Sequence, residues 1–309
     1  MAIVTVCVLT YNPDWTKFRN TLKSIICQKG VDFDIVISDD GSKNNCFDKA
    51  EKYLKENNFS AYCFIANKQN QGTVKNTISA LQTIKSKYVK LISPGDFLYD
   101  ENTLAKFTDF AEKNPAAAYF GNAVYYSANE NGEINIYETL HNPRDLKPWI
   151  DQDEKRIRRN YILRQDYILG ACFFCNKSIF EDYVKKIDNI IKYTEDFSFV
   201  WQITDKQKII YNRIPFIFYE YGFGISTASS NKWNTILRTD NLNGLELMYK
   251  NKSISFLELQ LFKSQNRLVR LFLKLLLDPL RILNKFRGKG NGVIINIKES
   301  EEKINFILK

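Results

Sequence analysis

Hydrophobic and polar positions along residues 1–115 alternate between two periods. Short apolar runs rich in β-branched residues predict buried strands, and they lie at 3–9, 33–38, 61–65 and 88–92. The segments between and after them carry apolar residues three or four positions apart. This spacing predicts helices at 16–27, 43–57, 75–85 and 101–113. Strands that alternate with helices in this way predict βαβ units and a parallel sheet covered by helices on both faces.

From residue 116 onward the pattern becomes richer in strands. Strands are predicted at 116–126, 133–139, 170–175 and 209–217. Helices are predicted at 153–164, 177–187 and 195–204. We therefore expect one α/β domain over 1–244 with halves 1–115 and 116–244, followed by a basic, Leu-rich helical region at 245–309. A small terminal hairpin is expected at 293–308.

The positive charge is concentrated late in the chain. Residues 250–290 hold ten Lys or Arg against Glu258 and Asp278, a surplus of eight out of the net charge of +9. This placement argues against a nucleic-acid-binding module, whose folded face would carry the charge. The basic residues of 267–287 interleave with Leu and Phe. Such a helix either packs on its own domain or on a second subunit, or lies on an anionic membrane surface, which we favour.

Cysteine and hydropathy patterns indicate a cytosolic chain. Cys172 and Cys175 have CxxC spacing, but no second pair completes a zinc site, so reduced thiols in a strand are expected. No run of about 18 apolar residues predicts a membrane-spanning helix. The N-terminus runs directly into a strand, so no leader is expected.

Polar side chains follow the first two predicted strands. Thr10, Tyr11 and Asn12 come directly after the first strand, and Asp39 and Asp40 after the second. Ligands of parallel sheets bind beyond the carboxyl ends of the strands. An aromatic face beside carboxylates therefore predicts a nucleobase pocket.

Further polar residues complete a nucleotide site of this kind. Gly72 precedes a helix on which Lys75 could meet phosphate oxygens, and Asp96 follows the fourth strand, where a carboxylate could hold a divalent ion. Glu195 and Asp196 open a later helix, and a carboxylate there could deprotonate a hydroxyl group.

Each of these pieces also has an ordinary structural explanation. Asp-Gly-Ser at 40–42 is a common turn. The sequence Thr194-Glu195-Asp196 is a common helix start with Thr194 as N-cap. The order of the pieces along the chain is more specific than any one of them.

That order resembles glycosyltransferase family 2 over roughly residues 2–226. The matching elements are Thr10-Tyr11-Asn12, Asp39-Asp40-Gly41-Ser42, Asn70-Gln71-Gly72 with Lys75-Asn76, Ser93-Pro94-Gly95-Asp96 and Glu195-Asp196. The resemblance implies a GT-A fold: a Rossmann-like nucleotide-binding half and an acceptor-binding half around one mostly parallel sheet, here with a C-terminal helical appendage.

The resemblance also implies roles for individual residues. Thr10, Tyr11 and Asp39 would hold the base, most often uracil, and Asp96 would ligate Mn²⁺ or Mg²⁺ between the donor phosphates. Asp196 would be the general base of a single inverting displacement, with Glu195 as its neighbour or as an acceptor contact.

Three departures from the family pattern affect these roles. Positions 93 and 95 are normally acidic but hold Ser and Gly here, so weak metal binding is expected. Lys75 replaces the usual Arg and lacks its fork geometry. His141, the only histidine, lies outside any matching motif, so a late histidine ligand is absent.

The expected function is that of a hexosyltransferase-type glycosyltransferase. By resemblance to bacterial capsule and exopolysaccharide enzymes, it would move a sugar from a UDP-sugar to a hydroxyl of a lipid-linked oligosaccharide. It would do so in the cytoplasm, peripherally on the inner face of the cell membrane. The stretch 221–226 resembles their post-catalytic loop, which would cover the donor diphosphate. The alternative is a non-catalytic nucleotide-sugar-binding partner of another transferase, which the reduced acidic motif favours.

Overall fold

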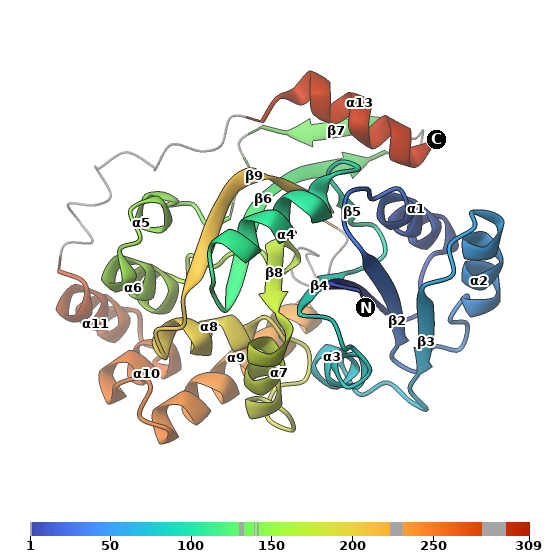
Figure 1. Ribbon diagram of the computed structural model, residues 1–309. Helices are drawn as coiled ribbons and strands as arrows, with labels where there is room; N and C mark the ends of the chain where they lie inside the picture. Colours follow the sequence, from blue (N-terminus) through green and yellow to red (C-terminus); the bar gives the residue numbers. More distant parts are fainter. Residues whose placement is uncertain (1, 130–132, 139, 141, 223–230, 280–294) are drawn as a thin grey trace.

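A nine-stranded sheet runs through the part of the molecule that the computed structural model describes, namely residues 2–129, 133–138, 140, 142–222, 231–279 and 295–309 (Figure 1). The strand order is β3-β2-β1-β4-β8-β6-β9-β5, with β7 paired to β6. The strands are β1 Val4–Thr10, β2 Phe33–Asp39, β3 Tyr62–Ala66, β4 Tyr88–Ile92, β5 Phe97–Leu98, β6 Ala118–Ala128, β7 Ile134–Tyr137, β8 Phe173–Asn176 and β9 Ile209–Glu220.

The first half of the sheet is parallel. β1 pairs in parallel with β2 and with β4, so that Val4 lies opposite both Phe33 and Tyr88. Every residue of β1 is buried, as its continuous apolar run predicts for a central parallel strand. In the second half β8 is antiparallel to β4 and β6, whereas β9 is parallel to β6. The expected α/β class is confirmed.

Helices of the first half cover both faces of this sheet. They are α1 Trp15–Ile26, α2 Phe47–Glu56, α3 Thr73–Leu81 and α4 Thr103–Lys113. α1 and α2 lie on one side of β1–β4 and α3 on the other, as Figure 1 shows. α1 begins at Trp15 because the carboxylate of Asp14 accepts a hydrogen bond from the backbone N–H of Lys17 (2.9 Å).

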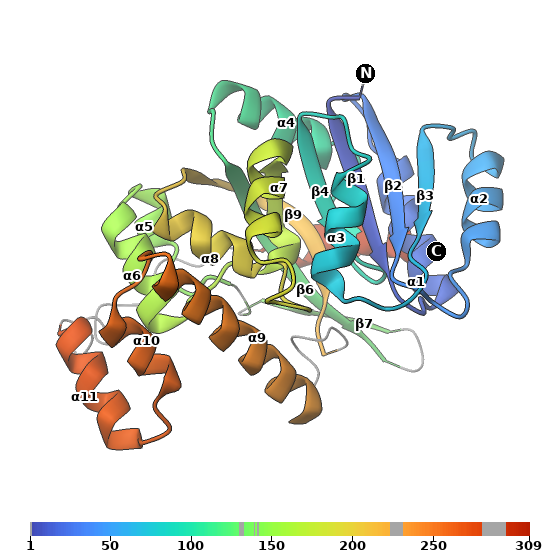
Figure 2. The ribbon, with the colours of Figure 1, turned by 90° about the horizontal axis from the view of Figure 1, so that it is seen from below.

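Helices of the second half lie beside β8 and β9 (Figure 2). They are α5 Lys147–Ile150, α6 Glu154–Arg164, α7 Lys177–Lys186 and α8 Phe197–Thr204, with a 3₁₀ turn at Gly170–Cys172. α8 begins two residues later than predicted, and Asp196 rather than Thr194 occupies the N-cap position. The reason is a tight turn, because the N–H groups of Phe197 and Ser198 bond to carbonyls three residues back, at Thr194 and Glu195.

The C-terminal region is built from α9 Asn231–Lys250, α10 Phe256–Lys263, α11 Arg267–Leu277 and α13 Ile297–Leu308. The expected division between residues 244 and 245 lies inside α9, which is continuous across it. A β-carbon on Gly244 would stand 2.5 Å from the Phe197 ring of α8. This close approach ties α9 to the preceding domain.

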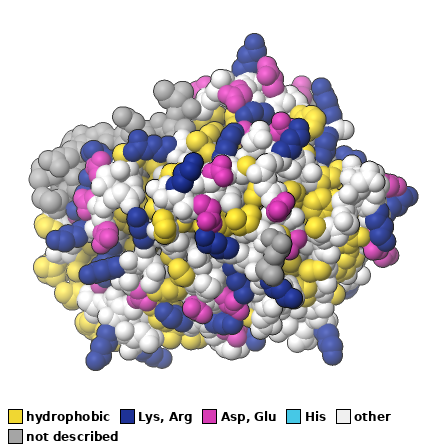
Figure 3. Space-filling model, in the orientation of Figure 1, with side chains coloured by type: hydrophobic (Ala, Val, Ile, Leu, Met, Phe, Trp, Pro, Cys, Tyr) yellow, Lys and Arg dark blue, Asp and Glu magenta, His cyan; other side chains and the backbone are white. Residues whose placement is uncertain are grey.

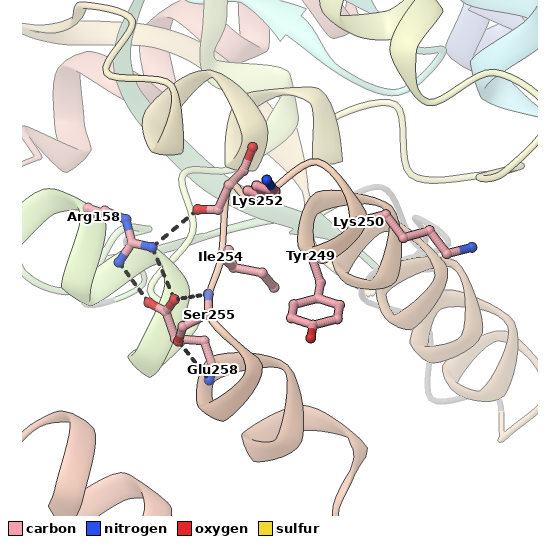
Figure 4. A pocket seen from close by; sticks show the side chains of 8 residues that line it. Arg158, Tyr249, Lys250, Lys252, Ile254, Ser255 and Glu258 are labelled. Atoms are coloured by element: carbon pink, nitrogen blue, oxygen red, sulfur yellow. Dashed lines mark hydrogen bonds and ion pairs between the residues drawn. The ribbon is translucent and has the colours of Figure 1, made fainter.

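An ion-pair network holds α10 and α11 against α6. The carboxylate of Glu258 accepts from Arg158 (2.7 Å) and from the backbone N–H of Ser255 (2.8 Å), closing a capping box (Figure 4). At the end of α11, the buried carboxylate of Asp278 lies 2.7 Å from Arg164. The open hollow drawn in Figure 4 is lined in part by these bonded groups, and none of the predicted site residues lines it.

The end of the chain is a helix, so the hairpin expected at 293–308 was wrong over its described part. The side chain of Asn296 caps α13 by accepting from the N–H of Glu299 (3.2 Å). Ile304 and Ile307 are buried at helical spacing and form a second core with Phe97 and other residues of the sheet. The charged residues between the apolar positions face solvent only if the segment is helical.

Some expected features lie outside the described residues. These are His141, most of the loop 221–226, the end of the expected helix at 267–287, and residues 293 and 294. Within the described ranges, none of the helices is both long and apolar enough to cross a bilayer.

We predict that Ile304→Ala lowers the free energy of unfolding of the full chain by about 2–5 kcal/mol, because it leaves a cavity in the second core. Glu302→Ala, an exposed change on the same helix, should stay within about 0.5 kcal/mol. Urea denaturation followed by circular dichroism measures both. Equal stability of the two variants would contradict the packing of α13 on the sheet.

Candidate active site

One large cavity lies at the carboxyl ends of β1 and β4 and reaches across to α8 and α9. Its volume is about 1060 Å³. Of the residues predicted from the sequence, it is lined by Thr10, Tyr11, Asn12, Asp40, Asp96, Glu195 and Asp196. Asp39, Gly72 and Lys75 are not among its lining residues. The fold thus brings the strand-end loops and the late Glu-Asp pair to one space.

Asp39 ties together the loops that follow β1 and β2. Its carboxylate accepts from the hydroxyl of Thr10 (2.9 Å) and from the N–H of Ser42 (2.8 Å) and is almost completely buried. The hydroxyl of Ser42 in turn accepts from the N–H of Asn12 (2.6 Å). Tyr11 belongs to this fixed loop, lines the cavity and is 55% exposed. An open aromatic face on a rigid support suits a planar base.

Asp40 and Gly72 shape the start of α3. The carboxylate of Asp40 accepts from the N–H groups of Gln71 (2.9 Å) and Gly72 (2.8 Å), and burial raises its pKa. Gly72 has a φ of +94°, and a β-carbon there would stand 2.3 Å from the carbonyl oxygen of Lys192. Lys75 points elsewhere, because its ammonium nitrogen lies 3.9 Å from Asp188.

The Glu195–Asp196 pair follows a loop that α3 and α9 both contact. The carbonyl of Lys192 accepts from the N–H of Val74 on α3 (3.2 Å). The carboxylate of Asp240 on α9 accepts from the N–H groups of Lys192 (3.2 Å) and Tyr193 (2.7 Å). Burial raises the pKa of both Glu195 and Asp196, and the charge of Asp196 raises that of Glu195 further. A carboxyl group with a raised pKa is a better base near neutral pH.

Asp96 lies at the opposite wall, in a turn after β4. Its N–H bonds to the carbonyl of Ser93 (3.0 Å), and burial raises its pKa to about 7, although the positive charge of Lys90 opposes this shift. Lys90 itself is buried within β4 and donates to the carbonyl of Ala171. Burial lowers the pKa of Lys90 to about 8.

The sequence did not reveal the ion pair beside Asp96. The ammonium of Lys17 donates to both carboxylate oxygens of Glu220, at 2.6 and 2.7 Å. Glu220 ends the largely apolar strand β9, and a charged residue in that place is the one local signal of a functional contact. The pairing joins residues 203 positions apart, so no local pattern predicts it.

The residues at this corner do not form a complete metal cage. Across the described residues, no group of three or more His, Cys, Asp or Glu has the arrangement to hold a metal ion. Ser93 and Gly95 supply no carboxylate. Mg²⁺ in nucleotide enzymes is commonly held by one or two carboxylates together with phosphate oxygens. Asp96 therefore fits a cation that a bound diphosphate would share.

Comparisons with known proteins agree with this geometry. Residues 5–187, more than half of the chain, match the family model "Glycosyl transferase family 2", and the chain belongs to that family. It is a glycosyltransferase, as the strand-end motifs predicted. Members of the family use nucleotide-sugar donors and commonly a divalent cation. No curated protein sequence gives a significant match.

Solved structures show the same fold at low sequence identity. Staphylococcus aureus TarS 1–349 in complex with UDP-GlcNAc superposes with a TM-score of 0.56 and 16% identity, over 84% of this chain and 70% of that one. Another S. aureus TarS structure gives a TM-score of 0.52 and 15% identity, over 92% of this chain and 54% of that one. The expected GT-A fold is confirmed.

We predict that kcat/KM for sugar transfer falls on the acid side with an apparent pKa well above the usual Asp value of about 3.9. The base must be deprotonated to act. Burial raises the pKa of the Glu195–Asp196 pair, so activity is lost as pH falls through this raised pKa. A pH–rate profile of UDP release measures it. An acid limb near pH 4 would show that no buried carboxylate limits the reaction.

Proposed function

We propose that the chain is an inverting transferase that moves a sugar from a UDP-sugar to an acceptor hydroxyl, with Asp196 as general base. The observation that carries this proposal is the shared cavity. Its walls combine Tyr11 and Thr10 on one side, Asp96 at the end of β4, and the buried Glu195–Asp196 pair on the other. A donor held by the strand-end loops would direct its anomeric carbon toward that pair.

The base site would be built from the loop after β1. Tyr11 would stack on the uracil, and Thr10 and Asn12 line the same side of the cavity. Asp39 would act on the base directly or by holding Thr10, to which it is bonded. Asp40 and Gly72 would contribute by fixing the start of α3. The choice of uridine is supported by S. aureus TarS, a structure of the same fold in complex with UDP-GlcNAc.

The reaction would be a single displacement. Asp196 takes the proton of the acceptor hydroxyl while the oxygen of that hydroxyl forms a bond to the anomeric carbon of the donor sugar. The bond from that carbon to the diphosphate oxygen breaks, and UDP leaves with the electron pair. Glu195 would hold the acceptor or keep Asp196 in place. When bound, Mn²⁺ or Mg²⁺, held weakly through Asp96, would stabilise the charge on the leaving diphosphate.

A second candidate function is a non-catalytic partner that binds nucleotide sugar for another transferase. The replacement of two motif acids by Ser93 and Gly95 favours it. The buried Glu195–Asp196 pair in the cavity opposes it, because a binding module has no need of a base.

We predict that Asp196→Asn lowers turnover by about 10²-fold or more while donor binding is kept, since general-base catalysis contributes that much. Release of the nucleoside diphosphate from a panel of UDP-, GDP- and dTDP-sugars measures turnover, and calorimetry with UDP measures binding. Asp182→Asn on the exposed face of α7 is the matched control and should leave both unchanged. Equal turnover of Asp196→Asn and the parent would remove Asp196 from the base role. A parent protein that binds UDP but never turns over a donor would favour the non-catalytic partner.

The acceptor is proposed to be a lipid-linked oligosaccharide of bacterial surface polysaccharide synthesis, such as capsule, reached from the inner face of the cell membrane. α11 supports this proposal because one face of it is apolar and uncovered. Its exposed apolar side chains are Leu268, Val269, Leu271, Phe272, Leu275 and Leu276. Hydrophobic atoms gather at the left edge of Figure 3, where α11 lies in Figure 1. Arg267, Arg270 and Lys274 lie on the same helix.

An interfacial helix on anionic lipid combines buried apolar side chains with nearby basic ones. A second copy of the chain could also cover this face, which would make the protein a homo-oligomer. Vesicle binding and oligomeric state distinguish the two arrangements.

We predict that the protein sediments with vesicles containing anionic lipid, less with neutral ones, and is partly released by salt, because each basic side chain contributes about 1 kcal/mol. Leu268→Ser with Phe272→Ser should abolish sedimentation. Phe306→Ser, an equally exposed change on α13, is the control and should not. Light scattering that shows a dimer, together with no vesicle binding, would assign the face to a subunit contact.

A further inference from the structure

The corner of the cavity at Asp96 contains a carboxylate that the family motif does not place there. Gly95 stands where the motif normally has an acid, with a φ of +103°. A β-carbon on residue 95 would lie 2.7 Å from Oε2 of Glu220. The carboxylate of Glu220 therefore occupies the space into which a side chain at position 95 would extend. The acid that the family motif has at position 95 is absent here, and the carboxylate of Glu220 at the end of β9 lies in its place.

Lys17 forms an ion pair with this carboxylate. Its ammonium group contacts both oxygens of Glu220 at 2.6 and 2.7 Å, and both residues line the cavity together with Asp96. The lysine side chain is 35% exposed, whereas that of Glu220 is 9% exposed. The lysine is thus the more accessible partner of a nearly buried carboxylate.

The charge of the cavity bears on what can bind there. Among the described residues, six carboxyl side chains line it against two ammonium groups: Asp14, Asp40, Asp96, Glu195, Asp196 and Glu220 against Lys17 and Lys232. A diphosphate is itself multiply negative and would be repelled by this surplus. Lys90 does not line the cavity, because its ammonium is buried behind Asp96 on the carbonyl of Ala171.

We propose that Glu220 and Asp96 together form the divalent-cation site of this chain, and that Lys17 is the counter-ion which the metal displaces and which then contacts the donor diphosphate. This inference rests on the proposed transferase function and assigns its metal ligands. Asp96, Glu220 and Lys17 carry a formal charge of −1, which a divalent cation changes to +1. The corner then attracts a diphosphate instead of repelling it.

The ligand chemistry agrees with this assignment. Two carboxylates leave several coordination positions of Mn²⁺ or Mg²⁺ for diphosphate oxygens and water, the arrangement typical of Mg²⁺ in phosphate-transfer sites. The protein alone would bind the metal weakly, because Lys17 competes for Glu220. Nucleotide would strengthen binding by adding ligands and by drawing Lys17 away.

The test measures Mn²⁺ binding to the full chain by electron paramagnetic resonance of the free ion, with and without UDP. Glu220→Gln should weaken Mn²⁺ binding in the presence of UDP by about tenfold or more, since even indirect metal partners contribute about that much. Glu220→Asp, which keeps a carboxylate, should recover part of the affinity. Lys17→Gln should strengthen Mn²⁺ binding without nucleotide, because it removes the competing cation.

The opposite signs of the two substitutions separate a metal site from a purely structural ion pair. Glu112→Gln breaks an ion pair of similar length (2.7 Å, with Lys87) on the surface and should leave Mn²⁺ binding unchanged. Thermal melting identifies a variant that fails to fold. If Glu220→Gln fails to fold, the Mn²⁺ affinity of Glu220→Asp is compared with that of the parent instead.

Two results would overturn the inference while leaving the transferase function intact. One is Mn²⁺ affinity equal in Glu220→Gln, Glu220→Asp and the parent. The other is UDP binding that needs no metal and is lost in Lys17→Gln. That result would mean that the ammonium group of Lys17 binds the diphosphate in place of a metal ion. A parent protein that binds no UDP, with or without Mn²⁺, would instead contradict the proposed function.

Discussion

The contact between the start of α3 and the loop before Glu195 is the constraint on which the site depends. Gly72 leaves room for the carbonyl of Lys192, which accepts from the N–H of Val74 (3.2 Å). From the other side, Asp240 on α9 accepts from the same loop. Because backbone groups of the loop take part in each of these bonds, the loop cannot shift without leaving polar atoms unpaired. The loop that leads to Glu195 and Asp196 is thereby fixed relative to the start of α3.

Buried charge is concentrated around this cavity, and the fold compensates each part of it differently. Asp39 and Asp40 are satisfied by hydroxyl and backbone donors, which makes them supports for the loops. Glu195 and Asp196 have raised pKa values, because burial is not offset by a cation. Glu220 has a lysine partner. The partners of these carboxylates thus differ, although all are the same chemical group.

The C-terminal region joins the catalytic body at several places, so it is more than an appendage. α9 packs Gly244 on Phe197, the residue after Asp196, and α13 closes a core with Phe97, the residue after Asp96. Among the described helices, α11 has the largest group of exposed apolar side chains. An acceptor held at a membrane by α11 would approach a cavity that α9 also lines, which links the surface helix to the site.

The sequence by itself determined the alternation of strands and helices and the motifs at strand ends, because period and turn chemistry are local properties. It therefore predicted β1, β2 and β4. The resemblance of the motif order to glycosyltransferase family 2 implied one shared site for Tyr11, Asp96 and Asp196, and all three line the cavity. It failed where local patterns were ambiguous, as in the helix α13, whose buried face is defined only by the sheet beneath it. Only the tertiary structure decided that Lys75 pairs outside the cavity while Lys17 meets Glu220 within it. Such pairings depend on how distant strand ends converge, and no spacing along the chain encodes that distance.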